Sequence, residues 1–370
     1  MPRDNGVIGT ILVSNESRFG QSLAVRPSAT ATSSVAETTM TVDHHELYVR
    51  RAEAPTSSLR RFIRELAPQD LLVSVYLVGI VSAVLNARPS AARSAGLLDV
   101  VALMVLHTGT ILAIRTHRLP NGWVVPALYR LVTYGCVQVT YFMFAQLLPI
   151  ANPRSLDDQL YHLDLSLFGV EPAVYFDRFV NTITTEWFAF FYFSYFFVLA
   201  LHVLPILFFS RNNRLLSEFA LGMLFLFCIG HTLYILVPGY GPYKALPELF
   251  AHHLPRGIWW NATTELVARS GAQKDIFPSL HTAAPTFILL FSFHNRAETP
   301  FRYTWPIVAF FAGNIIIATM FLRWHYVIDV VAGLLLAVTA HQLAVRLTAR
   351  ELVRRNALGL DDIWPAWPKS

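Results

Sequence analysis

The sequence predicts an all-α fold, a polytopic bundle of membrane-spanning helices, and its composition and apolar runs lead to that prediction. Hydrophobic residues make up 54% of the 370 residues and charged residues 14%, a balance that is unusual for a soluble chain. Several apolar stretches are long enough for the ~20 residues that a helix needs to cross a bilayer. The formal net charge of +5 comes from scattered basic residues, which fit membrane topology and do not indicate a nucleic-acid partner.

The chain divides into four parts. Residues 1–68 are rich in Ser, Thr and Ala and predict a disordered polar tail, without the apolar core of a signal peptide. Residues 69–123 predict two additional transmembrane helices, residues 124–346 a six-helix membrane core, and residues 347–370 a cytoplasmic tail. The eight predicted spans are residues 70–87, 97–115, 124–149, 187–209, 217–237, 278–295, 304–322 and 326–346.

The spans differ in how clearly the sequence marks them. The first, fourth and seventh are clear apolar runs, whereas Pro285 and several small or polar residues interrupt the sixth. Cys136 and Cys228 lie inside apolar stretches and show no metal-ligand or disulfide spacing. We interpret both cysteines as packing residues.

The arginines predict the orientation, because cytoplasmic loops carry an excess of basic residues. With both termini cytoplasmic, the arginines on that side are Arg60, Arg61, Arg64, Arg115, Arg118, Arg211, Arg214, Arg296, Arg302, Arg346, Arg350, Arg354 and Arg355. The long loops 150–186 and 238–277 are then extracytoplasmic, and the short loop 88–96, with Arg88 and Arg93, runs against the rule. Three polar clusters, at 238–244, 277–281 and 323–329, fall on the extracytoplasmic side, so we expect them to form one site.

The segment Arg323-Trp-His-Tyr-Val-Ile-Asp329 places three costly polar groups at the start of an apolar run. On a helix, His325 and Asp329 would share one face, one turn apart. A carboxylate at that distance can orient an imidazole and make it a better nucleophile or base. The alternative is an interfacial anchor, which suits Trp324 and Tyr326 but leaves the His–Asp pair unexplained.

The segment Phe277-Pro-Ser-Leu-His-Thr282 opens the sixth span. Proline suits the first turn of a helix, and the free amides there, with the Ser279 hydroxyl, can bind an anion such as phosphate. His281 would lie within reach as an acid or base. A helix started by proline, with an incidental interfacial histidine, is the equally weighted alternative. Lys244 in Pro238-Gly-Tyr-Gly-Pro-Tyr-Lys244 could add a positive charge, or be an ordinary loop lysine.

The loop segment 156–167 carries Asp157, Asp158, His162 and Asp164, which suggests a metal site. Leucines at helical spacing in the same segment favour an amphipathic helix on the membrane surface instead. Among the histidines inside apolar spans, His231 lies nearest the predicted site.

These motifs resemble the type 2 phosphatidic acid phosphatase (PAP2) superfamily of membrane phosphatases and phosphotransferases. Pro278-Ser279-Leu280-His281 and His325-Tyr-Val-Ile-Asp329 match its Pro-Ser-x-His and His-x-x-x-Asp elements in order. Leucine after the serine, and the Arg-aromatic-His-Tyr wording, look like the inositolphosphotransferase branch, which includes inositol phosphorylceramide synthase. Two features depart from the family: its Lys-to-Arg-Pro motif is absent, and Thr319 stands where many members have arginine.

The resemblance implies that residues 124–346 are a catalytic membrane domain that acts on a lipid phosphate or phospholipid in the bilayer. His325 would attack phosphorus, oriented by Asp329, and His281 would protonate the leaving group and then deprotonate the acceptor. Ser279, Arg323 and Lys244 would bind the phosphate. The expected enzyme is metal-independent and has no cofactor. Its acceptor is water in a phosphatase, or a polyol such as inositol in a transferase. A transporter with intramembrane histidines, or a non-catalytic scaffold, are the alternatives from other classes.

Overall fold

The structure is a computed structural model that describes residues 58–120, 122–270 and 273–368. Most of the predicted N-terminal tail, residues 1–57, lies outside the described residues. Seven described helices are long and apolar enough to cross a membrane, and the described residues contain no strand beyond an isolated bridge between Gly239 and Asp275. The prediction of an all-α, polytopic membrane bundle is therefore confirmed.

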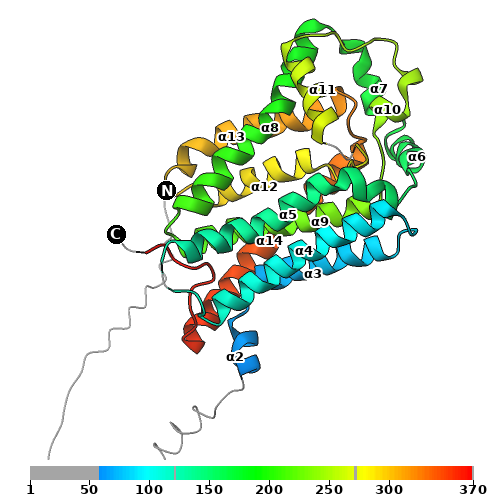
Figure 1. The fold of residues 1–370 in the computed structure, drawn as a ribbon. Helices are drawn as coiled ribbons and strands as arrows, with labels where there is room; N and C mark the ends of the chain where they lie inside the picture. The colour runs from blue at the N-terminus through cyan, green and yellow to red at the C-terminus, as the bar shows by residue number, and fades with distance from the viewer. Residues whose placement is uncertain (1–57, 121, 271–272, 369–370) are drawn as a thin grey trace, which may run out of the picture. The chain divides into compact units, whose positions relative to one another are not determined.

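Four helices begin the described chain (Figure 1): α2 (Ser58–Glu65), α3 (Pro68–Leu85), α4 (Ala91–Arg115) and α5 (Val124–Ala151). Pro68 starts α3, where its missing N–H costs no hydrogen bond. Asp70 in the same turn accepts the Ala67 N–H at 2.8 Å and pairs with Arg115 at 2.9 Å. Both side chains of this ion pair are buried, so it joins the first two long helices.

The remaining long helices are α8 (Thr182–Phe209), α9 (Asn213–Leu236), α13 (Phe301–Phe321) and α14 (Val327–Leu358), and they surround the shorter α12 (Leu280–His294). With 15 residues, α12 is about 22 Å long, less than the ~30 Å hydrocarbon core of a bilayer. The sixth predicted span is thus a short helix packed against α9, α13 and α14. Because its neighbours cover it, α12 can contain Pro285 and polar side chains that a lipid-facing helix would avoid.

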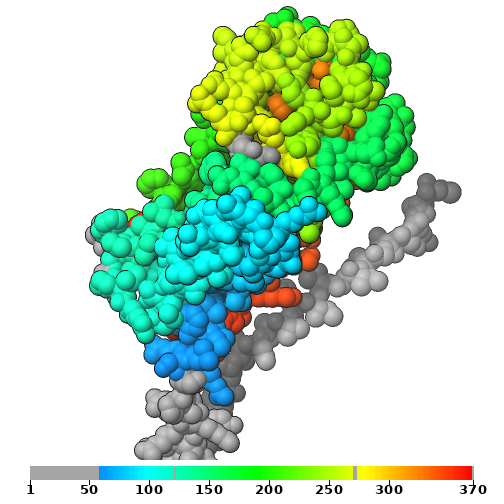
Figure 2. All heavy atoms as spheres, turned by 45° about the vertical axis from the view of Figure 1, so that its right-hand side comes forward, coloured from blue at the N-terminus to red at the C-terminus, as the bar shows by residue number. Residues whose placement is uncertain are grey.

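Two groups of short elements connect the long helices at one end of the bundle (Figure 1). The first group is α6 (Asp157–Phe168), α7 (Pro172–Phe176) and η1 (Asp177–Phe179); the second is α10 (Pro242–Ala245), η2 (Pro247–Leu249) and α11 (Ile258–Ser270). In the space-filling view, green and yellow atoms of these connections cover most of this end, with small orange areas between them (Figure 2). The starts of α12 and α14 reach the same end (Figure 1), so all three predicted polar clusters lie there.

The arginine-rich segments lie at the opposite end. There α14 continues to Leu358, past the predicted limit of the last span. Buried Arg355 supports this extension, because it donates to Glu351 Oε1 at 2.7 Å and to the Glu65 carbonyl at 2.6 Å. Beyond the helix, Trp364 is buried against Tyr129 with ring centroids 5.0 Å apart. The C-terminal segment is thereby tied to the first helices of the chain.

Candidate active site

A cavity of about 650 Å³ lies at the end of the bundle where the short elements gather. Its walls come from α5, α8, α9, α10 and α11, from Gln273, Asp275 and Ile276, from the start of α12, and from the turn before α14. His281, His325 and Lys244 line it, whereas Ser279, Arg323 and Asp329 are not among its lining residues. Three of the six predicted site residues therefore share one cavity, and the other three lie behind its wall.

His325 and Asp329 meet at the start of α14, although not on one helical face as the sequence suggested. The helix begins at Val327, so His325 precedes it and Asp329 lies in its first turn. One Asp329 oxygen accepts the Tyr326 N–H at 3.0 Å and lies 3.4 Å from His325 Nδ1. That separation is long for a hydrogen bond, as is common in catalytic pairs without substrate. The carboxylate thus faces Nδ1 and leaves Nε2 as the other ring nitrogen.

His325 is held in its neutral form. Burial lowers the pKa of His325 to about 4, despite the opposing effects of Asp275 and of the Ile276 backbone. A neutral imidazole carries the lone pair that a nucleophile needs. At neutral pH, His325 therefore has a free lone pair without first losing a proton.

His281 lies in the first turn of α12, between two tyrosine rings of α8. Its ring is stacked on Tyr192 at 4.2 Å between centroids and contacts Tyr195 at 4.1 Å. The His281 and His325 rings are 6.3 Å apart, and Nε2 of His281 has no hydrogen-bond partner among the described residues. The two imidazoles face one cavity at a separation that leaves room for a reacting group between them.

Ser279 joins the two histidine motifs. As the N-cap of α12, its Oγ accepts the Thr282 N–H at 3.3 Å, and its own N–H donates to the Asp329 carbonyl at 3.0 Å. The start of α12 and helix α14 approach each other closely at Gly333, where a Cβ would stand 2.6 Å from the Ser279 carbonyl oxygen. The serine thus fixes the start of α12 on α14, and its hydroxyl is engaged in the cap.

Arg323 holds the two connecting groups together. One of its terminal nitrogens donates to Asp177 at 2.7 Å and to the His252 carbonyl at 2.7 Å, and the guanidinium lies 4.0 Å from the Phe250 ring centre. The backbone at Arg323 is left-handed, with φ 65°, and Arg323 is not among the residues that line the cavity. The structure therefore places this predicted phosphate-binding arginine in a loop contact.

Lys244 is the predicted cation that does line the cavity. Its ammonium lies 4.0 Å from the centre of the Tyr240 ring, and it makes no ion pair with any residue in the described part of the chain. It belongs to the short helix α10. Lys244 and the two histidines therefore line the same cavity.

The loop segment 156–167 forms the helix α6, as its leucine spacing predicted. Its carboxylates also have partners that the sequence did not reveal. Asp157 accepts the N–H groups of Tyr240 and Gly241, both at 2.8 Å, and the Tyr326 hydroxyl at 3.1 Å. Gly241 is required here, because its φ is 81° and a Cβ would stand 2.2 Å from the Trp324 carbonyl oxygen. Asp157 thus links the segment just before α10 to the turn that carries His325.

Asp164 caps the helix that follows His325. Its two carboxylate oxygens accept the N–H groups of Val327 at 2.6 Å and Ile328 at 2.9 Å. Burial raises the pKa of neighbouring Glu171 to about 8, so Glu171 is mostly protonated at neutral pH and can share its proton with Asp164. The acidic residues of α6 therefore hold the segment that follows His325. No group of three or more potential metal ligands occurs among the described residues.

The sequence reasoning missed Asp275 and the tyrosines of the cavity. Asp275 lines the cavity and accepts the Tyr141 hydroxyl at 3.0 Å. It lies only four residues before Ser279, so a charged residue next to the Pro-Ser-Leu-His motif was an available signal. Tyr141, Tyr192 and Tyr234 lie inside predicted spans, where aromatic residues are too common to mark a site.

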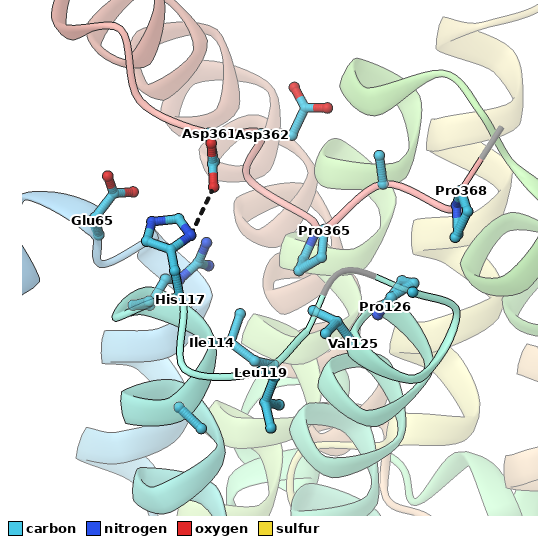
Figure 3. A pocket seen from close by; sticks show the side chains of 14 residues that line it. Glu65, Ile114, His117, Leu119, Val125, Pro126, Asp361, Asp362, Pro365 and Pro368 are labelled. Carbon is cyan, nitrogen blue, oxygen red and sulfur yellow. Dashed lines mark ion pairs between the residues drawn. The ribbon is translucent and has the colours of Figure 1, made fainter.

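A second cavity, of about 380 Å³, lies at the opposite end of the bundle. Figure 3 shows His117 and Asp361 facing each other across it, with 3.6 Å between Nδ1 and the carboxylate. Both of these side chains are substantially exposed, and the wall opposite them carries the apolar side chains of Ile114, Leu119 and Val125. The buried charged residues of this cavity, Glu65 and Arg115, are held in ion pairs with Arg355 and Asp70, so the first cavity, with its two buried histidines, is the candidate active site.

A family model described as "PAP2 superfamily" matches residues 158–343, just over half of the chain. The matched region begins in α6 and ends in α14, so it includes both histidines, Lys244 and Asp275. No curated protein and no solved structure matches the chain.

Proposed function

Since this chain belongs to the PAP2 superfamily, we propose that it transfers the phosphoryl group of a membrane lipid through a covalent phosphohistidine, with His325 as nucleophile. The observation that carries the proposal is the pair of imidazoles 6.3 Å apart in one cavity. Asp329 faces Nδ1 of His325 at 3.4 Å, so the attacking atom is Nε2.

The reaction has two steps. In the first, His325 Nε2 forms a bond to phosphorus while the bond from phosphorus to the leaving oxygen breaks, and His281 gives that oxygen a proton. In the second, an acceptor hydroxyl attacks phosphorus, the N–P bond breaks, and His281 takes the proton of the acceptor. The histidines end as they began.

Charge on the phosphoryl oxygens is stabilised by Lys244, which lines the cavity, and by the start of α12. Ser279 and Arg323 act as positioning residues in this scheme. Ser279 holds α12 against α14, and Arg323 fixes the turn before His325 by binding Asp177. Their predicted contact with phosphate is replaced by this indirect role.

The site is proposed to face the extracytoplasmic side. The short helices α10 and α11, which contribute to the cavity wall, lie at the end of the bundle opposite the end of α14 (Figure 1). The last turns of α14 carry Arg350, Arg354 and Arg355, and arginine-rich ends face the cytoplasm. For the acceptor, we favour a polyol such as inositol over water. A volume of about 650 Å³ exceeds the need of one phosphate group, and the hydroxyls of Tyr141, Tyr192 and Tyr234 in its walls suit a hydroxylated group.

The test uses the full chain, purified in detergent. Diacylglycerol release from phosphatidic acid and from phosphatidylinositol is measured with EDTA, with and without added myo-inositol. We expect activity that EDTA does not remove, that His325→Asn abolishes, and that His162→Asn leaves intact because His162 is exposed on α6. From phosphatidic acid with added myo-inositol, a phosphoinositol product would identify a transferase, and inorganic phosphate a phosphatase. Equal activity in His325→Asn and wild type would refute the proposed nucleophile.

A further inference from the structure

Asp275 is a buried carboxylate in the candidate active site that the proposed reaction does not use. Its backbone forms the bridge to Gly239, and one carboxylate oxygen accepts the Tyr141 hydroxyl at 3.0 Å. Burial raises the pKa of Asp275, while His325 is close enough to lower it. The carboxylate is thus fixed on both its backbone and its side chain, next to the nucleophile.

A negative charge at this place is unexpected in a site for phosphate, and the nearby cations do little to offset it. Among the described residues that line the cavity, the cations are Lys244 and Arg269. Arg269 is paired with Glu265 at 2.6 Å, and Arg323 is paired with Asp177 outside the cavity. Lys274, next to Asp275 in the chain, does not line the cavity, and its ammonium donates to the carbonyls of Pro153 and Arg154. Within the described lining, one lysine without an ion pair therefore faces one aspartate.

The charge of the substrate then matters. A phosphate monoester carries about −1.5 to −2 charges at pH 7, whereas a diester has one ionisable oxygen fewer and carries about −1. Each added negative charge beside Asp275 either repels the carboxylate or forces it to take up a proton, and both cost free energy in a buried site. The same difference persists in the covalent intermediate, because a diester leaves a phosphohistidine that keeps its second ester group.

We propose that Asp275 is a specificity-determining residue that makes this site select phosphodiester lipids over phosphomonoester lipids. The inference rests on the proposed function, since it assumes that the phosphate binds between His281 and His325. With a diester, His325 Nε2 bonds to phosphorus, the bond to one alkoxide breaks, and His281 protonates that alkoxide. The other alcohol stays on phosphorus and is passed with it to the acceptor.

A pair of lipids that differ by one methyl group tests this role. Phosphatidic acid is a monoester, and phosphatidylmethanol is the diester with the same diacylglycerol leaving group. We expect wild type to prefer phosphatidylmethanol, and Asp275→Asn to raise kcat/KM for phosphatidic acid so that the diester-to-monoester ratio falls at least tenfold. Asp158→Asn, which neutralises an exposed carboxylate on α6, should keep the wild-type ratio. An unchanged ratio in Asp275→Asn would overturn the proposal.

Tyr141→Phe separates charge from packing. It removes the hydrogen bond that lowers the pKa of Asp275 but keeps the acidic side chain, so the ratio should fall less than in Asp275→Asn. If Tyr141→Phe and Asp275→Asn lower the ratio equally, the effect comes from disturbed structure and the role of the charge is refuted.

Measurements of anion binding test the role of Asp275 independently of the proposed reaction. If wild type turns over no lipid, the proposed function fails, and the affinities for inorganic phosphate and dimethyl phosphate at pH 8 still test the charge of Asp275. Line broadening in ³¹P NMR measures both. We expect Asp275→Asn to bind inorganic phosphate at least tenfold more tightly, with little change for dimethyl phosphate. Equal changes for the two anions would contradict selection by charge.

Discussion

At the scale of single residues, the site depends on two imidazoles whose surroundings differ. His325 lies in the turn before α14, with Asp329 near Nδ1. His281 lies between Tyr192 and Tyr195, and its Nε2 has no partner among the residues that the structure describes. One ring is thus oriented by a carboxylate and the other is enclosed by aromatic faces, which suits a nucleophile and a proton carrier respectively.

The pH dependence follows from His325. Its pKa is lowered to about 4 by burial, and in the proposed mechanism the neutral ring attacks phosphorus. We therefore expect kcat/KM not to fall as the pH drops through 6.5, and to decline only as the pH approaches about 4. Assays from pH 3.5 to 8, each followed by return to pH 7.5 to confirm that activity recovers, measure this. An acidic limb centred near pH 6.5 would contradict the burial of His325.

His281 has a role that depends on the leaving group. His281→Gln should lower kcat for a lipid substrate about 10²–10⁴-fold, because an alkoxide leaves poorly without a proton. With methyl p-nitrophenyl phosphate the loss in the first step should be much smaller, since nitrophenolate needs no proton. Burst kinetics of nitrophenolate release measure that step, with His162→Gln as control. Equal losses for both substrates would argue against proton donation by His281.

The sequence could predict these two histidines because each lies in a short motif with a local reason for its spacing. It could not place the side chains of Arg323 and Ser279. Arg323 binds Asp177, 146 residues away in the chain, and Ser279 binds the backbone of Asp329. Contacts between distant segments are absent from a local pattern, and the role of Asp275 became visible only with its neighbours.

At the scale of elements, the connecting groups position the start of α14. Asp157 and Asp164 of α6 bind the segment from Tyr326 to Ile328, and Arg323 links η1 to the loop at His252. The sequence predicted the helix over 156–167 from its leucines. The partners of its aspartates depend on how α6 docks, which the leucine spacing does not specify.

The Arg323–Asp177 pair tests whether this arginine acts through position. Both side chains are buried, and the Arg323 guanidinium lies 2.7 Å from the Asp177 carboxylate. Arg323→Met and Asp177→Asn should therefore each reduce activity and thermal stability. The double variant should be no worse than the more severe single variant, because both changes remove the same contact. Activity and the melting temperature in detergent are measured for the full cycle. If Arg323→Met raises KM for lipid while Asp177→Asn leaves stability and KM unchanged, the arginine binds phosphate directly.

At the scale of the whole molecule, the bundle has a site end and an arginine-rich end. We predict that the site end faces outward from the cytoplasm. Cys136 and Cys228 are buried, so a single added cysteine can report its side. Ser166→Cys on α6 should react with a membrane-impermeant maleimide in intact cells, whereas Ala297→Cys, in the turn before α13, should react only after lysis. Both native residues are exposed, and the reverse pattern would invert the proposed orientation.

Hydropathy predicted the seven long helices, because apolar runs of that length are typical of membrane-spanning helices. It could not show that the sixth apolar segment is the short α12, packed among α9, α13 and α14. A helix surrounded by protein escapes the length and polarity limits that lipid imposes. This position also puts His281 inside the bundle, where Tyr192 and Tyr195 enclose it.

The most direct test of the account is to trap the intermediate. Wild-type protein and His325→Asn are mixed with a lipid carrying ³²P in its phosphate, quenched in alkali within milliseconds to seconds, and digested for peptide mapping by mass spectrometry. A covalent phosphohistidine at His325 predicts a base-stable, acid-labile label on the peptide that contains His325 in wild type and none in His325→Asn. Rapid turnover without any label, or a label on another residue, would contradict it.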